Sequence, residues 1–288
     1  MDAILITGVS SGIGYGTAKV FANQGYQVFG SIRKHQDAQR LKAEIGSNFI
    51  PLLFDITDSN ALLQAAQQVT LMLEGKELAG LINNAGIATS GPLIYQSLDE
   101  IRWQFEVNVI AQIAVIQTFL PLLKFRKSPT SKPGRIINIS SVGGRIAAPF
   151  IGAYASSKHA IEGMSHSLRR ELQLHGIDVI IIAPGAVNTP IWDNESAQNI
   201  SRYATTEYAK PIQAFQKYFT HMGKQGYSSE VIGKFIKKVF ETQNPKARYA
   251  IVPNPIPNWI IPLALPHRWL DKLIAINFGL LPKRQLFK

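Results

Sequence analysis

The 288-residue sequence contains no cysteine. Disulfide bonds, thiolate metal sites and cysteine nucleophiles are therefore excluded, and we expect no metal site. A chain without cysteine suits a reducing compartment, which predicts a cytoplasmic protein. The first residues, Met1 to Ile6, have neither the basic flank nor the long apolar core of a secretory signal.

Long hydrophobic runs are also missing. The nearest candidate, residues 256–266, is interrupted by prolines and is shorter than the ~20 apolar residues that a membrane-spanning helix needs. We therefore expect a protein that is soluble or attached to a membrane surface. A hydrophobic content of 46% is ordinary for a globular chain with a sizeable core.

Acidic residues are few: 19 stand against 30 lysines and arginines, for a formal net charge of +11. Such a charge suits nucleic acid, anionic lipid or anionic small molecules as partners. No nucleic-acid recognition motif accompanies it, so we expect no nucleic acid partner. The basic excess is strong in residues 244–288, where Asp271 is the only acid.

Short apolar runs alternate along the chain with longer segments of helical period. We predict strands at Ala3–Ile6, Gln27–Ile32, Phe49–Phe54, Gly80–Asn83, Arg135–Ser140, Asp178–Ala183 and Arg248–Val252. We predict helices at Ile13–Gln24, Ala38–Ile45, Asn60–Leu73, Leu98–Phe125, Ala153–Leu174 and Ser229–Glu241. This alternation predicts an α/β fold of Rossmann type: one doubly wound, seven-stranded parallel sheet with helices on both faces.

The domain organisation follows from where this pattern stops. Residues 1–252 are predicted to form one dinucleotide-binding catalytic domain. No confident element falls between residues 184 and 228, and a loop of that length is typical of a lid, which we place at 187–228. Residues 253–288 are predicted to form an apolar and basic C-terminal extension.

A glycine-rich turn lies between the first strand and the first helix. Gly8, Gly12 and Gly14 have the spacing Gly-x-x-x-Gly-x-Gly. Such glycines permit a tight turn and let the backbone approach a pyrophosphate at the helix N-terminus. Glycines in a turn with no ligand would look the same, so the context of strand before and helix after is what favours a dinucleotide site.

The end of the second predicted strand indicates which dinucleotide binds. An acid there favours the ribose 2′-hydroxyl of NAD(H), whereas an arginine accommodates the 2′-phosphate of NADP(H). This chain has Arg33 and Lys34 and no acid. A solvated arginine on a basic protein is the plain alternative, yet the missing acid favours NADP(H), with NAD(H) use left open.

Tyr154 and Lys158 lie four residues apart, so they share one face of the predicted helix. A tyrosine has an ordinary pKa near 10, which is too high for efficient proton transfer at neutral pH. We expect the ammonium of Lys158 to lower the pKa of Tyr154 and make it a general acid or base. Ser141, at the end of the fifth strand, can donate a hydrogen bond to a substrate carbonyl. A Tyr-x-x-x-Lys pair alone would indicate no more than an exposed helix face.

Taken together, these motifs resemble the short-chain dehydrogenase/reductase family across nearly the whole chain, and most closely its hydroxysteroid and retinol dehydrogenase-like members. The matching marks, in order, are Thr7-Gly8-x-x-x-Gly12-Ile13-Gly14, Asp55, Asn83-Asn84-Ala85-Gly86, Asn108-Val109, Ile139-Ser140-Ser141, Tyr154-x-x-x-Lys158 and Pro184-Gly185-x-Val187-x-Thr189. The resemblance implies an oxidoreductase that interconverts a carbonyl and an alcohol with a nicotinamide cofactor.

The resemblance also implies residue roles. Its catalytic set is Asn108, Ser141, Tyr154 and Lys158, with Asn108 bending its helix and holding a water of a proton relay. Ser140 is rejected as the catalytic serine because Ser141 has the family spacing to Tyr154. The implied and predicted cofactor-binding residues are Gly8, Ser10, Ser11, Gly12, Ile13, Gly14, Arg33, Asp55, Ile56, Asn83, Ala85, Gly86, Tyr154, Lys158, Pro184, Gly185, Val187 and Thr189. Ser11 departs from NADP(H)-preferring relatives that have a basic residue there.

The substrate side is less specific. The lid and the C-terminal extension are rich in aromatic residues, which could build an apolar pocket or only pack the lid onto the body. We expect a lipophilic substrate of steroid, retinoid or fatty type. The tail combines apolar and basic residues, which suits peripheral contact with an anionic membrane, whereas packing on its own or a partner subunit is the alternative.

Several other functions stay open at this stage. A 3-oxoacyl-thioester reductase is the first, although the long tail argues against that compact type. A non-catalytic, dinucleotide-sensing regulator of the same fold is the second, and such proteins typically lack the Tyr/Lys pair. A sugar-nucleotide epimerase is disfavoured by the glycine spacing. The resemblance further implies a homodimer or homotetramer, because helices 98–125 and 153–174 usually pair across a two-fold axis.

Overall fold

The computed structural model describes residues 1–125, 133–189 and 200–282. Its centre is a seven-stranded sheet in the order β3-β2-β1-β4-β5-β6-β7. Every adjacent pair of strands is parallel. The strands are β1 Ala3–Ile6, β2 Gln27–Ile32, β3 Phe49–Leu53, β4 Leu78–Asn83, β5 Arg135–Ile139, β6 Asp178–Pro184 and β7 Arg248–Ile251. The predicted doubly wound sheet is confirmed, with strand ends within two residues of the prediction.

The central strands are apolar because both of their faces are covered by helices. All four residues of β1 are buried, as are all six of β4. Pro51 lies in β3, an edge strand, where a missing N–H costs no ladder hydrogen bond.

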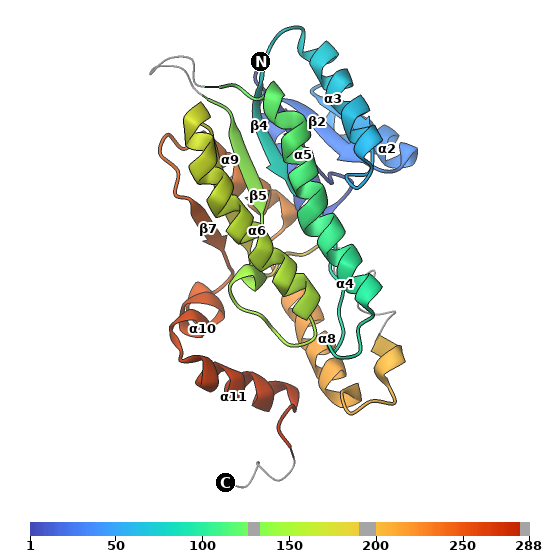
Figure 1. Cartoon of the computed structure of the whole chain (residues 1–288), viewed down its shortest axis with the longest axis vertical. Coiled ribbons are helices and arrows are strands. Elements are labelled where there is room, and N and C mark those ends of the chain that lie inside the picture. Colours follow the sequence, from blue (N-terminus) through green and yellow to red (C-terminus); the bar gives the residue numbers. More distant parts are fainter. Residues whose placement is uncertain (126–132, 190–199, 283–288) are drawn as a thin grey trace.

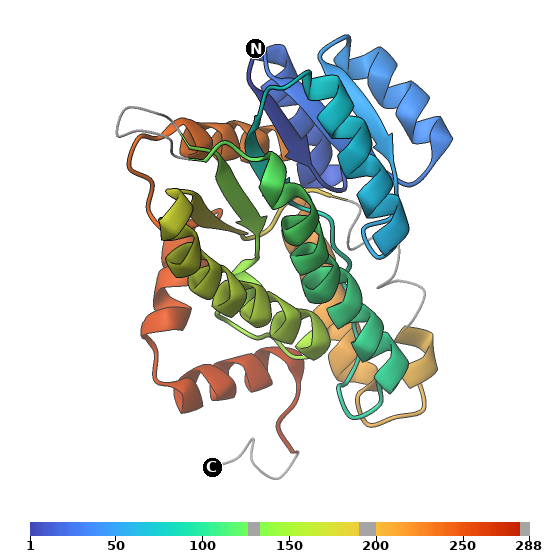
Figure 2. The same ribbon diagram turned by 45° about the horizontal axis from the view of Figure 1, so that its top comes forward.

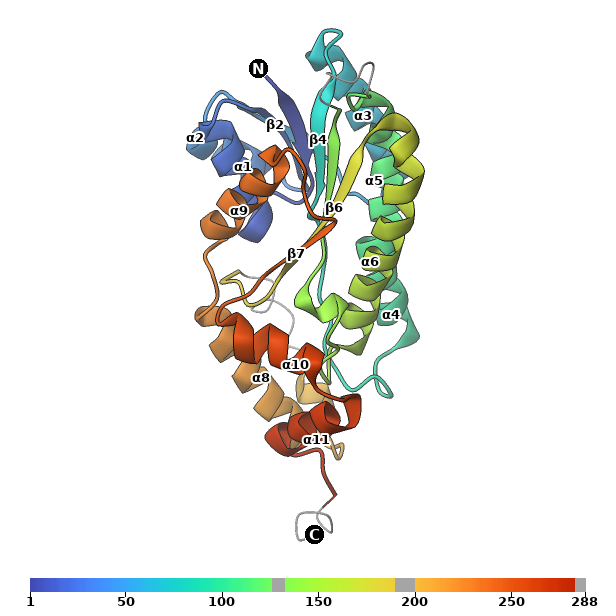
Figure 3. The same ribbon diagram turned by 90° about the vertical axis from the view of Figure 1, so that its left-hand side faces the viewer.

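One layer of helices covers each face of the sheet, as Figure 3 shows. The first layer contains α1 Gly12–Asn23, α2 His35–Ile45 and α9 Ser229–Glu241. The second contains α3 Ser59–Leu73, α4 Leu98–Phe105, α5 Ala111–Phe119 and α6 Gly152–Glu171. Two separate hydrophobic clusters fill the spaces between the sheet and the two layers. In Figure 2, α5 and α6 run beside each other over the second face.

The predicted helix from Leu98 to Phe125 is one rod with a local change of geometry. A π-helical turn, η1 Glu106–Ile110, separates α4 from α5, and a short 3₁₀ turn, Leu120–Leu122, ends it. By length and composition alone this helix could cross a membrane, yet 44% of its most apolar window is buried in the fold. A core helix passes the same test, and here the helix packs against the sheet and α3.

The region that we predicted as a lid loop contains a long helix, which corrects that prediction. Helix α8 spans Ala209–Lys224 and is preceded by a 3₁₀ turn at Ile200–Tyr203. Its buried positions, Pro211, Ile212 and Phe215, are three and four residues apart or adjacent, so they form one apolar face. Residues 190–199, including the predicted lid residue Trp192, lie outside the described residues.

The C-terminal extension folds back onto α8. Its elements are η7 Ile256–Ile260, α10 Ile261–Ala264 and α11 His267–Phe278. In Figure 1 these elements and α8 lie together beyond the carboxyl ends of the strands. Phe278 is 6% exposed and its ring contacts Phe215 and Tyr218 of α8. The lid helix and the tail therefore share a third hydrophobic cluster, which also includes Phe150 and Tyr154. The basic residues Lys283, Arg284 and Lys288 lie outside the described residues.

Candidate active site

A cleft of about 430 Å³ runs along the carboxyl ends of the strands, at the place where the strand order reverses between the neighbouring strands β1 and β4. Ligands of doubly wound folds bind at this switch point. The predicted residues that line the cleft are Gly8, Ser10, Ser11, Gly12, Ile13, Arg33, Asp55, Ile56, Ala85, Gly86, Ser141, Tyr154, Lys158, Pro184, Gly185, Val187 and Thr189. The fold thus brings residues from seven separate segments of the chain to one site.

The glycine-rich turn closes one end of the cleft. Gly8 and Gly12 have φ values of 70° and 59°, a backbone conformation that is strained for residues with a side chain. Ser11 is the N-cap of α1, yet its hydroxyl makes no capping hydrogen bond. The first turn of α1 is therefore not capped by the Ser11 side chain, and it borders the cleft through Ser11, Gly12 and Ile13. This arrangement can hold a phosphate group.

Gly14, which we predicted to bind the cofactor, does not line the cleft. A Cβ atom at this position would lie 2.1 Å from the carbonyl oxygen of Gly8 and 2.4 Å from Nδ2 of Asn84. Gly14 thus permits close packing of α1 under the turn. Asn84 holds the turn from below, because its amide donates to the carbonyl oxygens of Thr7 and Gly8 at 2.9 and 3.0 Å.

Two further contacts at the turn were not predicted. The backbone N–H of Gly8 donates to Oγ of Ser31 at 2.8 Å, and Ser31 also lines the cleft. Arg40 of α2 donates to the carbonyl oxygen of Ser10 at 2.8 Å. Neither contact has a signal in the sequence, because the partners are far apart along the chain: 23 positions separate Gly8 from Ser31, and 30 separate Ser10 from Arg40.

Arg33 lies at the rim of the cleft with its side chain 72% exposed. Its Nη1 atom is 3.7 Å from Oδ2 of Asp55, which also accepts hydrogen bonds from the backbone and hydroxyl of Thr57 through Oδ1. An exposed, loosely paired guanidinium at this place can turn toward a phosphate. The geometry therefore fits the 2′-phosphate of NADP(H).

Asn83 does not lie where we expected it. We predicted that it lines the cofactor cleft, but its side chain is fully buried and donates to Oδ1 of Asn138 at 2.9 Å. Asn138 in turn donates to Ser165 at 2.8 Å. The reason is strand alternation: Asn83 is the last residue of β4 and points into the helical layer, whereas Asn84, one residue later, borders the cleft.

The other end of the cleft carries Ser141, Tyr154 and Lys158. Tyr154 and Lys158 are 7% and 5% exposed. The hydroxyl of Ser141 hydrogen-bonds with the Tyr154 phenol and accepts from the N–H of Gly143 at 3.0 Å. The Lys158 ammonium donates to the carbonyl oxygen of Ile139 at 2.9 Å and is 5.7 Å from the Tyr154 ring centroid.

The electrostatics of this pair correct our expectation. Burial raises the pKa of Tyr154, and the hydrogen bond with Ser141 only partly opposes it. Burial lowers the pKa of Lys158 to about 8. Both shifts arise because each charged form loses its hydration. The ammonium donates to the carbonyl of Ile139, and the net shift of the Tyr154 pKa is upward in this structure because burial is its largest cause.

Asn108 lies in the π-helical turn and does not line the cleft. Its Oδ1 accepts from the N–H of Ile87 at 2.9 Å, and its Nδ2 donates to the carbonyl of Ile87 and to Ser157, both at 3.0 Å. The side-chain amide is therefore fully engaged in joining η1 to the segment after β4 and to α6. The expected water of a proton relay stays a prediction.

An apolar pocket of about 280 Å³ adjoins the cleft and shares Ser141, Tyr154 and Gly185 with it. One wall is the loop after β5, a second is α8 and a third is the tail. The lining residues that carry the argument are Val142, Tyr218, Phe219, Met222, Leu270 and Phe278. The tail therefore packs on its own subunit and forms part of a pocket next to the Tyr154 phenol.

Comparison with known proteins agrees with this geometry. A family model described as short chain dehydrogenase matches residues 2–200. The chain is 36% identical over 273 residues to an NADPH-dependent 3-dehydrocapnine reductase of Ornithobacterium rhinotracheale, covering 95% of this chain and 96% of that one. It is 32% identical over 250 residues to a 3-ketodihydrosphingosine reductase of Bacteroides thetaiotaomicron, covering 87% of each chain.

A solved structure confirms the fold. A short chain dehydrogenase/reductase from Burkholderia phymatum, crystallised in complex with NAD, superposes with a TM-score of 0.76 over 94% of this chain and 95% of its own. The two sequences are 20% identical, so this likeness concerns the architecture alone.

Proposed function

The chain belongs to the short-chain dehydrogenase family, and from that premise we propose that it is an NADP(H)-dependent oxidoreductase that reduces the carbonyl group of a lipophilic substrate to an alcohol. The observation that carries the proposal is the shared border of two spaces. The dinucleotide-shaped cleft and the apolar pocket meet at Ser141 and Tyr154. A carbonyl at this border would have its apolar part in the pocket and its reacting carbon at the cleft.

The residues at the border suit reduction. A bound nicotinamide cofactor supplies the hydride. Ser141 and Tyr154 can both donate a hydrogen bond to the carbonyl oxygen, and Tyr154 then transfers its proton to the developing alkoxide. Because burial raises the pKa of Tyr154, the phenol is protonated at neutral pH and is ready to act as the acid. The Lys158 ammonium stabilises the phenolate that remains and holds the Ile139 end of the serine loop.

We expect the reduction rate to fall as the pH rises through about 8. Lys158 has its pKa lowered to about 8, so its ammonium is present below that pH and is lost above it. The measurement is kcat against pH from 6 to 10 with NADPH. In Lys158→Arg the guanidinium keeps its charge throughout, so its lower rate should lose this alkaline limb. A wild-type profile that stays flat to pH 10 would contradict the role of Lys158.

NADPH is supported as the cofactor by Arg33 and by the relative that is named NADPH-dependent. The proposed substrate class is based on the two relatives compared above, whose names specify 3-dehydrocapnine and 3-ketodihydrosphingosine as substrates. We expect a panel of carbonyl compounds, assayed by the loss of NADPH absorbance, to show faster turnover of 3-ketodihydrosphingosine and 3-dehydrocapnine than of steroid, retinoid and short aliphatic ketones.

Arg33→Ser should raise KM for NADPH about tenfold and leave KM for NADH unchanged, because one charge-assisted contact to phosphate is worth roughly that much.

The panel also separates the alternatives. Preference for a 3-oxoacyl thioester would replace this proposal by the thioester reductase, and cofactor binding without any turnover would favour the regulator.

Gly223→Leu tests the pocket, because Gly223 lines it and an added Cβ would meet no atom within 4 Å. Filling the pocket should raise KM for the largest substrate about tenfold and spare a short ketone.

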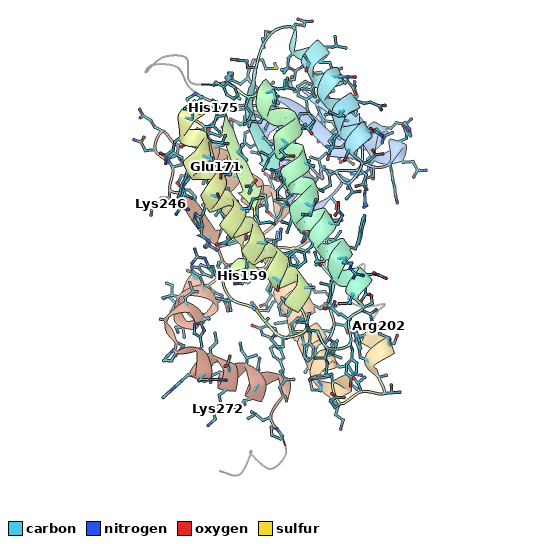
Figure 4. The ribbon with its side chains drawn as sticks, in the orientation of Figure 1. His159, Glu171, His175, Arg202, Lys246 and Lys272 are labelled. Atoms are coloured by element: carbon cyan, nitrogen blue, oxygen red, sulfur yellow. The ribbon has the colours of Figure 1, made fainter. Side chains whose placement is uncertain are left out.

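We further propose that the tail contacts an anionic membrane surface. The tail exposes large apolar side chains that do not line the pocket: Ile256, Ile260, Ile261, Leu263, Trp269, Leu273 and Ile276, each at least 46% exposed. Basic residues accompany them, including Lys272, which Figure 4 labels on α11 at the end of the molecule far from the sheet. Apolar side chains together with lysine and arginine suit an anionic interface, and other residues of the same tail line the pocket.

Co-sedimentation with vesicles tests this contact. The full-length protein should bind vesicles that contain phosphatidylserine better than neutral vesicles. Trp269→Ser with Leu273→Ser should lower the bound fraction severalfold, because both side chains are exposed and their loss does not disturb the core. Leu71→Ser on α3 is the matched control, since Leu71 is 78% exposed at a distant place. Equal partitioning of all three proteins would refute membrane contact.

A further inference from the structure

We propose that Glu162 of α6 is a positioning residue that fixes the Ser141 loop and the C-terminal wall of the substrate pocket to one buried point. The inference rests on the proposed function, because it assigns Ser141 to the reaction and the pocket to the substrate. It concerns a residue that follows Lys158 by one helical turn and touches neither space itself.

The first set of contacts holds the serine loop. Glu162 is 4% exposed and accepts hydrogen bonds from Oγ of Ser140 at 3.2 Å and from Nε of Arg145 at 2.9 Å. Lys158 holds the loop at Ile139. Two residues of one helix face thus bind the loop on both sides of Ser141. Gly144 shows how tight this packing is, because a Cβ there would lie 2.8 Å from Oε1 of Glu162.

The second set of contacts holds the tail. Arg248, the first residue of β7, donates from Nη2 to Oε1 of Glu162 at 2.8 Å and from Nε to Oε2 at 2.9 Å. The other side of its guanidinium faces Trp259 of η7, 4.8 Å from the ring centroid. The neighbours of Trp259, Pro257 and Asn258, line the substrate pocket. The pocket wall is therefore joined to the Ser141 loop through one guanidinium and one carboxylate.

The charges make this arrangement rigid. Burial raises the pKa of Glu162, but the hydrogen bonds from Arg248 and Arg145 together lower it by more than burial raises it. The net shift of the pKa is therefore downward, and the carboxylate is charged at neutral pH. A buried carboxylate with two guanidinium partners has strongly directional contacts, and removing its charge leaves both partners without their anion. The ion pair of Glu230 with Lys234, by contrast, is more than half exposed on both sides.

Four variants test the inference. Glu162→Gln should lower kcat about tenfold for large and small substrates alike, because it loosens the Ser141 loop. It should also raise KM for the large substrate, because it loosens the pocket wall, and it should leave the Kd for NADPH within about twofold. Trp259→Leu should raise KM about fivefold for the large substrate with kcat unchanged, and Trp259→Phe should restore KM because it keeps the aromatic face. Glu230→Gln, the control, should change neither constant.

Amide hydrogen exchange provides a readout that needs no turnover. In Glu162→Gln the segments 140–146 and 256–262 should both exchange faster at a temperature below the melting transition, and in Glu230→Gln neither should. Faster exchange in only one segment, or in neither, would overturn the inference. If both segments respond and no substrate of the panel is turned over, the proposed function fails and the coupling through Glu162 stands.

Discussion

Replacing Tyr154 by phenylalanine should lower kcat about a thousandfold, since a positioned general acid contributes on the order of 10²–10⁴ to a rate. The substitution removes one oxygen atom and keeps the ring, which packs in the cluster with Phe150 and Phe278. The Kd for NADPH should therefore stay within about twofold of the wild-type value. Stopped-flow reduction of the best panel substrate and fluorescence titration with NADPH measure the two effects.

Ser141→Ala is the companion variant. It removes the hydroxyl that hydrogen-bonds with Tyr154 and leaves the phenol in place. A smaller loss of kcat is expected, because Tyr154 still donates its proton. If Tyr154→Phe kept more activity than Ser141→Ala, the phenol would not be the acid and the proposed mechanism would be wrong.

Gly14→Ala should abolish NADPH binding and destabilise the fold, although it adds a single methyl group far from the reacting atoms. The new Cβ would lie 2.1 Å from the carbonyl oxygen of Gly8 and 2.4 Å from Nδ2 of Asn84, so the turn must move. Overpacking of this kind costs about 1–3 kcal/mol and here displaces the N–H groups that face the phosphates. Thermal unfolding and titration with NADPH measure both effects.

Gly163→Ala is the matched control for this change. Gly163 is also inside a helix, but an added Cβ meets nothing within 4 Å. Alanine there should raise the free energy of unfolding by about 0.5–1 kcal/mol and leave NADPH binding unchanged. Unimpaired NADPH binding by Gly14→Ala would mean that the turn tolerates movement and does not set the cofactor position.

The sequence predicts the sheet well because each strand is a local apolar run between turn residues. The lid helix α8 was missed although its apolar residues carry a helical signal. Ile212, Phe215, Phe219 and Met222 recur at intervals of three and four residues, and Pro211 lies in the first turn, where a helix tolerates proline. The helix is stabilised by ring contacts with Phe150 and Phe278, which come from distant parts of the chain.

The site divides in the same way. The glycine turn and the Tyr154, Lys158 and Ser141 set have fixed local spacing, and the structure brings them to one cleft. The direction of the pKa shifts was not predictable, because the exposure of Tyr154 and Lys158 depends on the whole surrounding fold. The predicted strand ends at Asn83 as β4 does, but the side of the sheet that the Asn83 side chain faces follows from the pleat of the folded strand.

The way in which the tail completes the pocket has a consequence for engineering. Leu270, Ile274 and Phe278 of α11 line the pocket for the substrate, yet no described residue of α11 lines the cofactor cleft. Substrate selectivity can therefore be redesigned by grafting a different terminal segment onto an unaltered cofactor-binding body. Arg248 and Trp259 mark the junction at which such a graft must remain native.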